Sequence, residues 1–428
     1  MDKSIASLTL AFAFAGAAIA EPAISALSVT QNSSRVVTID FTLSETAILT
    51  LDLTTNGVSI GAQNYRLMHD AESDSMDYPA NKVVPAGRHV FMWRAREDWP
   101  DHVFTNGEFA VELKAWSFSS PPDYMVVDLT TKSNRWFYAS AADLPEGGIK
   151  TADPNDADAV AELANDVYRT TKLVMRRIPA AGNKWRMGSP ESETTWRNAS
   201  EVLHYVTLTA DYYIGIYPLT DTQARLASGN IYLSRGIKPV NQLSYAWWRG
   251  TPTASAYNWP TNGHDIDPAK NMYPIRTLTG LEFDFPTEAQ WEYACRAGTA
   301  GSLNDGTGTF DAAKGNLLGW SASNTSAIQP VGLLKPNAWG LYDMHGNVWE
   351  WCLDQWQTHP DTPQIDPAGA TDNMSKRVVK GGTIKASLVQ GRSASRRGVP
   401  VDKGYDSDWA GWIGFRLCCP AVIPALED

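Results

Sequence analysis

Residues 173–420 form a long stretch in which glycine, asparagine, serine and tryptophan recur in irregular segments, with only a few short helices predicted. The whole chain holds 32 Gly, 25 Pro and 17 Trp, and tryptophan outnumbers both tyrosine and phenylalanine. Such a stretch cannot satisfy its buried backbone groups through helix and sheet hydrogen bonds alone. Bound metal ions and disulfides commonly supply the rest. We therefore expect a loop-rich, aromatic-rich globular domain, not a helical bundle.

Length, composition and charge limit the possible functions. A chain of 428 residues is expected to hold two or three domains, at roughly 150 residues each. Hydrophobic residues make up 43% and charged residues 19%, so the chain can bury real cores. Its formal net charge is −11. A nucleic-acid-binding protein needs a basic face, so this balance argues against nucleic acid as a partner.

The N-terminus has the pattern of a secretory signal peptide over residues 1–20. Lys3 precedes an apolar run from Leu8 to Ile19, and Ala18-Ile19-Ala20 forms a small-residue cleavage site. The alternative is an N-terminal core helix. The run is too short to cross a bilayer comfortably, and no later segment is long enough. We therefore expect an exported protein (secreted, periplasmic or at the cell surface) without a transmembrane segment, whose four cysteines are candidates for disulfides.

The next segment, residues 21–130, is predicted to be a β-sandwich domain. Its apolar and polar side chains alternate over residues 36–43, 47–53, 88–93 and 109–116, with turn signals between these runs. Short strands at this spacing favour an immunoglobulin-like sandwich. Residues 131–172 are predicted to be a linker with a short helix over 157–171, and residues 421–428 a C-terminal tail. The predicted fold class is therefore α+β.

Two helices in the irregular domain carry clear start and stop signals. Residues Thr220 to Gln223 and Thr287 to Gln290 are capping boxes, and Gly229 and Gly298 are expected to end the helices. On the second helix Cys295 lies four residues after a tryptophan, on the same face. We therefore expect Cys295 to face the core.

Several motifs follow one another in this domain in a recognisable order. They are Met187 to Glu193, Tyr213 to Thr220, Pro286 to Gly298, Asn337 to Trp351, Val379 to Thr383 and Gly414 to Arg416. The series resembles the formylglycine-generating enzyme (sulfatase-modifying factor) family. The resemblance covers more than half of the chain and none of residues 1–170. It implies the family's fold, a variant of the C-type-lectin fold with little regular secondary structure.

The resemblance also implies bound calcium. One Ca²⁺ of the family would be held here by the side chains of Asp343 and Glu350 and by the carbonyl groups of Gly346 and Val348. These are hard oxygen ligands on one short, glycine-containing loop, which suits Ca²⁺. The alternative is that both carboxylates are ordinary solvated acids and the neighbouring tryptophans simply pack.

A second calcium site of the family is matched only in its first half, by Asn316 and the carbonyl of Leu317. Its second half should offer a carboxylate, but residues 321–325 contain none. Asn324 or Ser323 could substitute as weak ligands. The occupancy of this site stays open.

The resemblance implies one disulfide. Cys295 matches a family cysteine that pairs with one just after the Gly-Phe-Arg motif; here that partner would be Cys418, although Cys419 follows directly. Closing so long a loop would stabilise the fold by on the order of 4 kcal/mol in the chain-entropy model. Four cysteines allow three connectivities, and Cys352 pairs with the remaining thiol or stays free.

The chain departs from the family at the catalytic centre. The family's enzymes oxidise a substrate cysteine to formylglycine with Cu(I) held by two cysteines, because soft thiolates select Cu(I). Counted without gaps from Gly381, those positions are Ala386 and Gly391, and no cysteine occurs between residues 353 and 417. We therefore expect neither copper nor this catalysis. An iron-dependent branch of the wider family needs a histidine-rich helical domain, which the strand-rich N-terminal segment does not resemble.

What remains for the domain is binding. The segment from Gly382 to Trp412 matches the surface that forms the family's substrate groove. Six of its side chains suit a peptide, protein or glycan ligand: Arg392, Arg396, Tyr405, Asp408, Trp409 and Trp412. The alternative for the two tryptophans is that they pack beneath the fold.

The leading hypothesis is an exported, calcium-stabilised, non-catalytic binding or surface-associated protein. The first alternative is a formylglycine-generating oxidase with an unrecognised set of copper ligands. The second is a structural component of a cell-envelope assembly.

Overall fold

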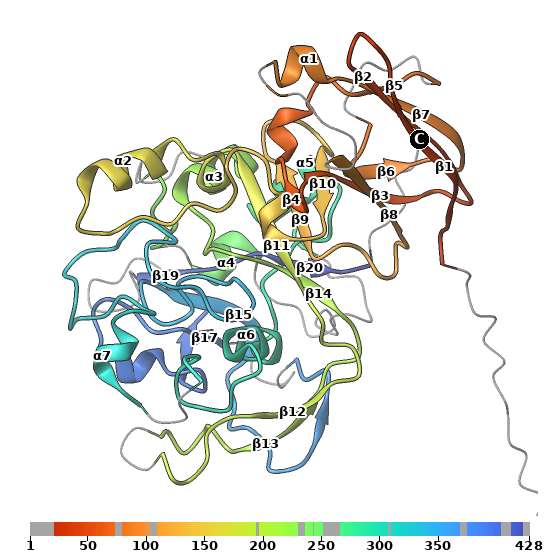
Figure 1. The fold of residues 1–428 in the computed structure, drawn as a ribbon. Helices are drawn as coiled ribbons and strands as arrows, with labels where there is room; N and C mark the ends of the chain where they lie inside the picture. Colours follow the sequence, from red (N-terminus) through yellow and green to blue (C-terminus); the bar gives the residue numbers. More distant parts are fainter. Residues whose placement is uncertain are drawn as a thin grey trace, which may run out of the picture.

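A computed structural model describes residues 21–72, 79–100, 102, 109–193, 197–229, 236–242, 244–250, 266–306, 310–368, 375–403 and 412–422. The predicted signal peptide lies outside these residues. An N-terminal part made of β-sheets stands beside a larger C-terminal domain (Figure 1). No helix within the described ranges is long and apolar enough to cross a membrane.

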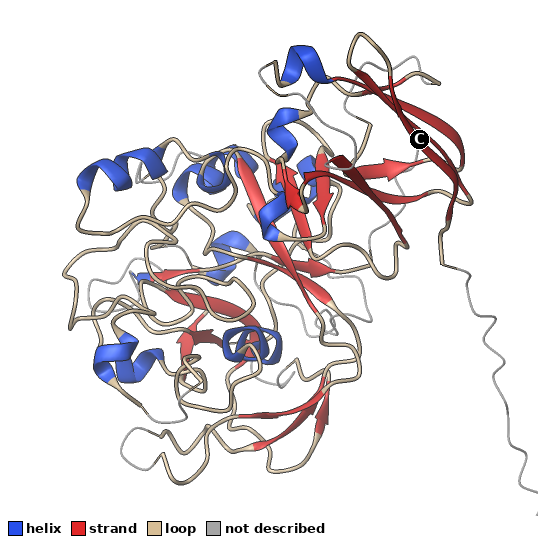
Figure 2. Cartoon of the chain, viewed as in Figure 1, coloured by secondary structure: helices blue, strands red, loops and turns tan. Residues whose placement is uncertain are grey.

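Two antiparallel sheets form the N-terminal part (Figure 2). One has the order β1-β2-β7-β5 and the other β4-β3-β6, with β8 also paired to β3. The bounds are β1 (Ile24–Gln31), β2 (Val36–Leu43), β3 (Ala47–Thr55), β4 (Val58–Ser59), β5 (His69–Asp70), β6 (Lys82–Val84), β7 (Gly87–Arg94) and β8 (Phe109–Trp116). Alternate residues of β2 are buried, and they share one hydrophobic core with residues of β3 and β7. The four strands predicted from alternation are therefore present.

The next two strands belong to the C-terminal domain instead. A five-stranded sheet runs β10-β9-β11-β14-β20. Its strands are β9 (Tyr124–Asp128), β10 (Arg135–Tyr138), β11 (Lys172–Ile178), β14 (Tyr212–Gly215) and β20 (Cys418–Pro420). Strand β9 is buried along nearly its whole length, because β10 and β11 flank it on either side. The sheet thus takes in β9 from the segment assigned to the β-sandwich and β10 from the segment assigned to the linker.

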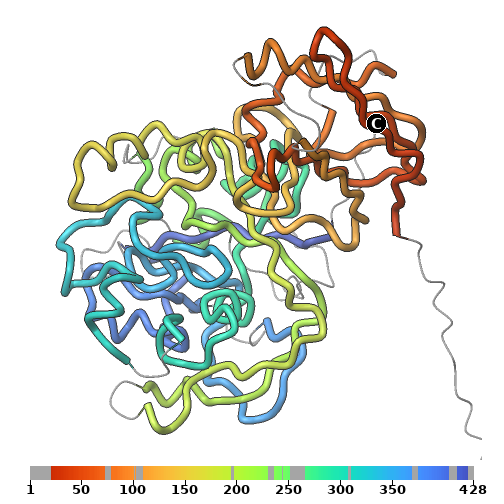
Figure 3. Tube along the Cα trace, in the orientation of Figure 1, coloured from red at the N-terminus to blue at the C-terminus, as the bar shows by residue number. Residues whose placement is uncertain are grey.

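Two smaller sheets and short helices complete the C-terminal domain. The sheets are β12-β13-β16 and β18-β17-β15-β19. Their strands are β12 (Lys184–Met187), β13 (His204–Thr207), β15 (Trp349–Gln355), β16 (Gln364–Ile365), β17 (Lys376–Lys380), β18 (Arg396–Pro400) and β19 (Ile413–Gly414). The α-helices among the described residues are α1 (Ala95–Asp98), α2 (Ala157–Ala164), α3 (Asp221–Ser228), α4 (Tyr245–Trp248), α5 (Met272–Thr279), α6 (Glu288–Arg296) and α7 (Ala312–Gly315). Long loops connect them (Figure 3), so the architecture is mixed α and β with little regular structure.

Helices α3 and α6 begin at the predicted capping boxes. The hydroxyl of Thr220 and that of Thr287 each accept the backbone N–H three residues later. Helix α3 ends at Gly229 in the left-handed conformation, as predicted, whereas α6 ends at Ala297, one residue before the predicted glycine. Helix α2 stops at Ala164, so the helix predicted over 157–171 is shorter.

Buried ion pairs hold the irregular loops of the C-terminal domain together. The carboxylate of Glu292 on α6 accepts from Lys380 Nζ at 2.9 Å and from Arg296 Nη2 at 2.8 Å. Likewise Glu350 Oε2 accepts from Arg416 Nε at 2.7 Å. Apart from Arg296, the side chains in these pairs are no more than 1% exposed. Charge-assisted hydrogen bonds of this kind satisfy backbone and side-chain groups that no sheet or helix reaches.

Candidate functional site

The candidate site is a groove of about 360 Å³ on the C-terminal domain. It is formed by the short 3-10 helix Leu388–Gly391, the chain that leads from it into β18, the first residue of β15 and the loop around residues 198–201. Its lining residues are Asn198, Glu201, Trp349, Val389, Gln390, Arg392, Ser395, Arg396 and Arg397. Most of the groove therefore lies within the segment that the sequence assigned to ligand binding.

The two arginines predicted to contact a ligand line this groove, but their guanidinium groups are buried. Arg392 donates to both carboxylate oxygens of Glu201, at 3.0 and 3.1 Å, and to Glu193 at 2.7 Å. Arg396 donates to both oxygens of Glu288, at 2.7 and 2.6 Å. Since the two arginine residues are 1% and 4% exposed, their first role is to fix the groove wall. Direct ligand contact by them stays a prediction.

The remaining predicted ligand contacts are divided between described and undescribed residues. Tyr405, Asp408 and Trp409 lie outside the described residues. Trp412 is half-buried and packs against the small cluster that includes Ile384, while Lys385 Nζ lies 5.0 Å from its ring centroid. Trp412 therefore shows the packing that the alternative interpretation gave to it.

Trp349 is a groove residue that the sequence analysis treated only as packing. Its side chain is 1% exposed and lines the groove, and its indole Nε1–H has no hydrogen-bond partner among the described residues. A buried donor left unpaired costs free energy, so an acceptor that reached it would be favoured. Because this nitrogen is sealed from solvent, a ligand acceptor reaches it only if neighbouring side chains of the groove move. The only feature of the sequence that points to Trp349 as a groove residue is its position inside the Asn337 to Trp351 motif. It directly precedes Glu350, whose carboxylate is buried.

The loop that carries the groove is held in place by His345. Its Nδ1–H donates to the carbonyl of Gly391 at 2.7 Å, and Nε2 accepts the N–H of Asn304 at 3.2 Å. Burial lowers the pKa of His345 to about 4, so the ring is neutral at physiological pH. Nearby, a Cβ on Gly382 would lie 2.8 Å from the Cα of Gly391, so the two backbones are in direct contact. These contacts fix the backbone beside the groove, and the neutral His345 ring adds no charge there.

All four cysteines of the chain are buried as free thiols. Burial raises the pKa of Cys295 to about 12 and raises the pKa of Cys352, Cys418 and Cys419 above their usual value as well. The thiolate is the form that binds a soft metal or attacks a substrate. None of the four thiols can therefore supply a thiolate to the groove at neutral pH in this conformation.

The disulfide expected between Cys295 and Cys418 is not formed in the structure. Cys295 Sγ lies 3.9 Å from the carbonyl of Met344 and 3.6 Å from the hydroxyl of Ser393. Cys418 Sγ instead lies 3.9 Å from Gln290 Oε1. Gln290 and Cys295 are five residues apart on α6, which is about 7.5 Å along the helix axis. Because the Cys418 thiol lies beside Gln290, it contacts a different part of the core from the Cys295 thiol.

The loop expected to hold calcium is tightly folded. Three of its residues, Asp343, Gly346 and Asn347, have left-handed backbones with φ of 56°, 109° and 65°. Asp343 Oδ2 accepts the N–H of Gly332 at 2.7 Å, while Oδ1 is buried with no hydrogen-bond partner within the described part of the chain. Burial raises the pKa of Asp343 to about 6. An unpaired buried carboxylate oxygen fits an oxygen-ligated cation.

The other predicted calcium ligands are less available. Glu350 accepts hydrogen bonds from Trp291 Nε1 and from two nitrogens of Arg416. At the second site, Asn316 Oδ1 accepts from Ser323 and the carbonyl of Leu317 accepts from the N–H of Lys335. Each of these oxygens already accepts a protein hydrogen bond, so a cation would have to share it or displace the donor. Cation binding by Glu350, Asn316 and Leu317 stays a prediction. The described residues include no cluster of three or more His, Cys, Asp or Glu side chains suited to a metal ion.

Residues 169–420 match the model of the family described as "Sulfatase-modifying factor enzyme 1-like domain". The chain belongs to this family. Two similar proteins are formylglycine-generating enzymes by name. The Mus musculus formylglycine-generating enzyme is 34% identical over 157 residues, which cover 33% of this chain and 40% of that protein. The Mycobacterium tuberculosis formylglycine-generating enzyme is 30% identical over 202 residues, which cover 40% of this chain and 65% of that protein.

A third relative carries a different name. The Bos taurus protein named inactive C-alpha-formylglycine-generating enzyme 2 is 35% identical over 159 residues, which cover 33% of this chain and 46% of that protein. The matches thus span less than two thirds of each of these three relatives. The family assignment is established for the C-terminal domain, whereas the activity of the relatives is not thereby established for this chain.

The sulfatase-modifying-factor domain also has a polar pocket of about 180 Å³ that shares Arg396 with the groove. His204, Glu288, Asp354 and His359 line it. Asp354 Oδ2 accepts the N–H of Glu288 at 2.6 Å, at the start of α6. Burial, together with the charge of Glu288, raises the pKa of Asp354 to about 7, so this carboxyl group is partly protonated at neutral pH.

Proposed function

We propose that this chain is an exported ligand-binding protein without oxidase activity. Its sulfatase-modifying-factor domain would take a peptide, or a segment of another protein, in the groove beside Trp349. The observation that carries the proposal is the state of the thiols. No cysteine occurs between residues 353 and 417, and each of the four in the chain is buried with a raised pKa.

The chemistry of the groove supports a peptide ligand. Its lining combines an indole N–H without a partner among the described residues, the exposed amide of Gln390 and the half-buried guanidinium of Arg397. Peptides offer backbone carbonyls at regular spacing, and such acceptors suit donors of this kind. A glycan would also offer acceptors, so glycan binding is an outcome of the test below.

The comparison with relatives is compatible with the loss of activity. A relative named inactive is about as similar to this chain as the relatives named as enzymes. The scaffold is therefore compatible with either state. Within the proposal, the N-terminal sheets are an immunoglobulin-like module and the C-terminal domain a lectin-like variant that displays the groove.

We also propose that the Asp343 loop binds Ca²⁺. The support is the unpaired Asp343 Oδ1, and the carbonyl groups of Gly346 and Val348 would complete the ligand set with Glu350. The ion would neutralise a buried carboxylate and hold the left-handed loop in shape. Ligand binding in the groove does not depend on this ion.

Two alternatives compete with the binding function. An oxidase would need copper ligands other than cysteine, and nothing in the groove favours such a set of ligands. A purely structural role in a cell-envelope assembly would leave the groove without a specific ligand. A binding experiment separates this second alternative from the proposal.

The experiment is selection from a random-peptide phage library on the purified chain, with a glycan array in parallel. Trp349→Phe removes the indole N–H and keeps an aromatic ring, and Gln390→Ala removes an exposed amide from the groove. Both variants should lose the selected peptides, whereas the control Gln364→Ala, which lies outside the groove, should keep them. Failure to enrich any peptide, or equal binding by all three variants, would contradict the proposal. Glycans that bind in place of peptides would change the ligand class.

A further inference from the structure

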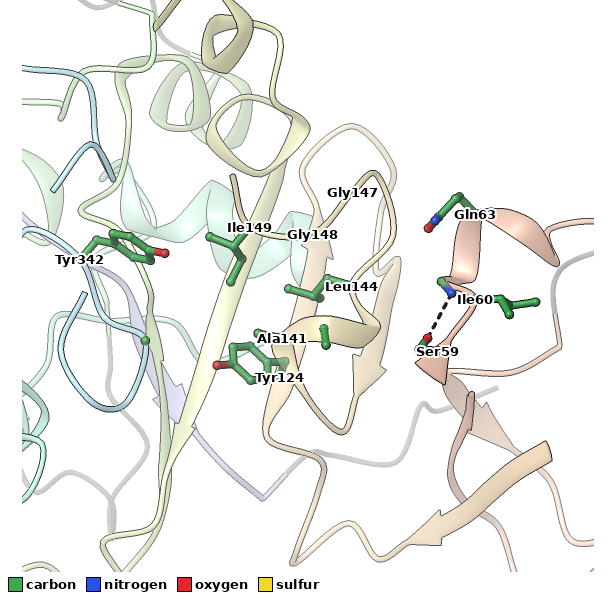
Figure 4. Close-up of a pocket in the computed structure, with 13 residues that line it drawn as sticks. Ser59, Ile60, Gln63, Tyr124, Ala141, Leu144, Gly147, Gly148, Ile149 and Tyr342 are labelled. Atoms are coloured by element: carbon green, nitrogen blue, oxygen red, sulfur yellow. Dashed lines mark hydrogen bonds between the residues drawn. The ribbon is translucent and has the colours of Figure 1, made fainter. Parts of the chain in front are cut away.

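A cavity of about 500 Å³ lies where the N-terminal sheets meet the C-terminal domain (Figure 4). One wall is the turn after β4, from Ser59 to Gln63, and a second is the segment from Ala141 to Ile149. Tyr124 on β9, with Gly340 and Tyr342, completes the lining. None of these residues belongs to the groove beside Trp349, so a ligand site here is independent of the proposed function.

The wall of this cavity is uncharged. Among the described residues its lining includes no Asp, Glu, Lys, Arg or His, although the chain as a whole has a net charge of −11. An ionic ligand that entered would lose its hydration without gaining an ion pair, which is unfavourable. The cavity therefore favours a neutral ligand.

Two tyrosine hydroxyls at the cavity are available for hydrogen bonds. Tyr124 and Tyr342 are only 8% and 5% exposed, and neither hydroxyl forms a hydrogen bond with another of the lining residues drawn in Figure 4. By contrast, the hydroxyls of the buried Tyr168 and Tyr212 each donate to a backbone carbonyl at 2.6 Å. Burial raises the pKa of Tyr124 and of Tyr342, so both stay neutral phenols that can donate and accept.

Several contacts link the walls of the cavity. Arg66 of the N-terminal part pairs with Glu146 of the second wall at 2.7 Å, although both side chains are exposed and the pair is therefore weak. The hydroxyl of Tyr168 donates to the carbonyl of Pro145 next to it, and the N–H of Gly61 donates to Ser59 Oγ at 3.1 Å. A site that is already formed loses less conformational entropy when a ligand binds.

The cavity also offers apolar surface beside the hydroxyls. Ile60, Leu144 and Ile149 line it, and Gly147 has open space where a side chain would stand. At about 30 Å³ per water molecule, the cavity has room for about 17 waters, a size that suits a ligand of roughly two sugar rings. Sugars combine neutral hydroxyl groups with apolar C–H faces, and this combination matches the lining.

We propose that this junction cavity binds a neutral oligosaccharide, with the hydroxyls of Tyr124 and Tyr342 as hydrogen-bonding partners. An uncharged peptide is the competing ligand, but it would present backbone amides at fixed spacing to a wall whose glycine N–H groups are partly committed. The N–H groups of Gly61, Gly148 and Gly340 already donate within their own turns. Hydroxyl-rich ligands adapt better to two phenol groups that can both donate and accept.

The experiment is saturation-transfer NMR and titration calorimetry on the purified full chain. The neutral probes are maltose, cellobiose, lactose and diacetylchitobiose; the contrast probes are an acidic disaccharide that contains glucuronate and an uncharged tetrapeptide. Tyr124→Phe and Tyr342→Phe each remove one oxygen and keep the ring. Each should weaken binding of the preferred sugar about tenfold, while Tyr205→Phe, an exposed tyrosine on β13, should leave it unchanged.

Three results would overturn the proposal. They are no saturable binding of any neutral probe up to about 10 mM, wild-type affinity in both phenylalanine variants, and preference for the acidic sugar or the peptide. Thermal unfolding of each variant checks that the fold is kept. Gln390→Ala in the groove must leave sugar affinity unchanged. The proposal of sugar binding in this cavity and the proposal of peptide binding in the groove are therefore tested separately.

Discussion

Replacing Glu292 by Gln tests whether buried ion pairs hold the irregular loops. The side chain of Glu292 is fully buried between Lys380 and Arg296, and its interactions with these cations lower its pKa from 4.5 to about 2 despite burial. A shift of that size corresponds to about 3 kcal/mol of folding free energy at neutral pH. For a domain of this size, that is a fall in Tm of about 6–12 °C.

The pH dependence gives the sharper check. Because the folded-state pKa is depressed, the stabilisation is fully present above about pH 4.5 and is lost as the pH falls towards about 2. Urea unfolding followed by tryptophan fluorescence at several pH values should show the gap between wild type and Glu292→Gln narrowing below about pH 4.5. The control is Glu162→Gln, whose carboxylate pairs with Lys150 on the surface and is screened by solvent. A Glu292→Gln loss no larger than the Glu162→Gln loss, or a gap that ignores pH, would refute the reasoning.

Three further predictions concern the calcium loop, the polar pocket and the glycine contacts. Calcium should raise the Tm of wild type but not that of Asp343→Asn, measured by calorimetry with and without a chelator; an equal response would contradict the assigned ligand. The folded-state pKa of Asp354 is raised to about 7, so wild-type stability should fall as pH rises from about 4 to about 7, and Asp354→Asn should lack that fall in urea titrations. A Cβ on Gly319 would lie 1.3 Å from the carbonyl oxygen of His345, so Gly319→Ala should yield no folded protein by near-UV circular dichroism. Gly229→Ala, with open space around its Cβ and a left-handed backbone, should cost only about 1 kcal/mol.

Local signals in the sequence predict the structure correctly where it depends on neighbouring residues. The capping hydroxyls of Thr220 and Thr287 act within three residues, and both helices begin where predicted. The helical spacing that places Cys295 on the core face is equally local, and its side chain is fully buried. The family is recognisable because its motifs keep their order along the chain, and the family model confirms it.

Pairings between distant residues are not visible in the sequence. Strand β9 pairs with β11 in the C-terminal sheet, with Met125 opposite Met175. The alternation of apolar and polar residues predicts a strand, but it does not predict which other strand it pairs with. In the same way, the sequence offers Arg396 to a ligand, but the structure places Glu288, more than a hundred residues earlier, against its guanidinium. The fold decides which partner a charged side chain meets. Arg392 and Arg396, predicted to contact a ligand, are therefore buried parts of the groove wall.

The most direct test of the central claim is a turnover assay on the purified protein. The protein is supplied with Cu(I) and Ca²⁺ and given a Cys-x-Pro-x-Arg peptide in air, and the product is followed by mass spectrometry beside an active formylglycine-generating enzyme. We expect no conversion, because the segment between residues 353 and 417 has no cysteine and the four existing thiols are buried. Loss of the peptide thiol with gain of an aldehyde, above the rate of a copper-only control, would contradict the non-catalytic account.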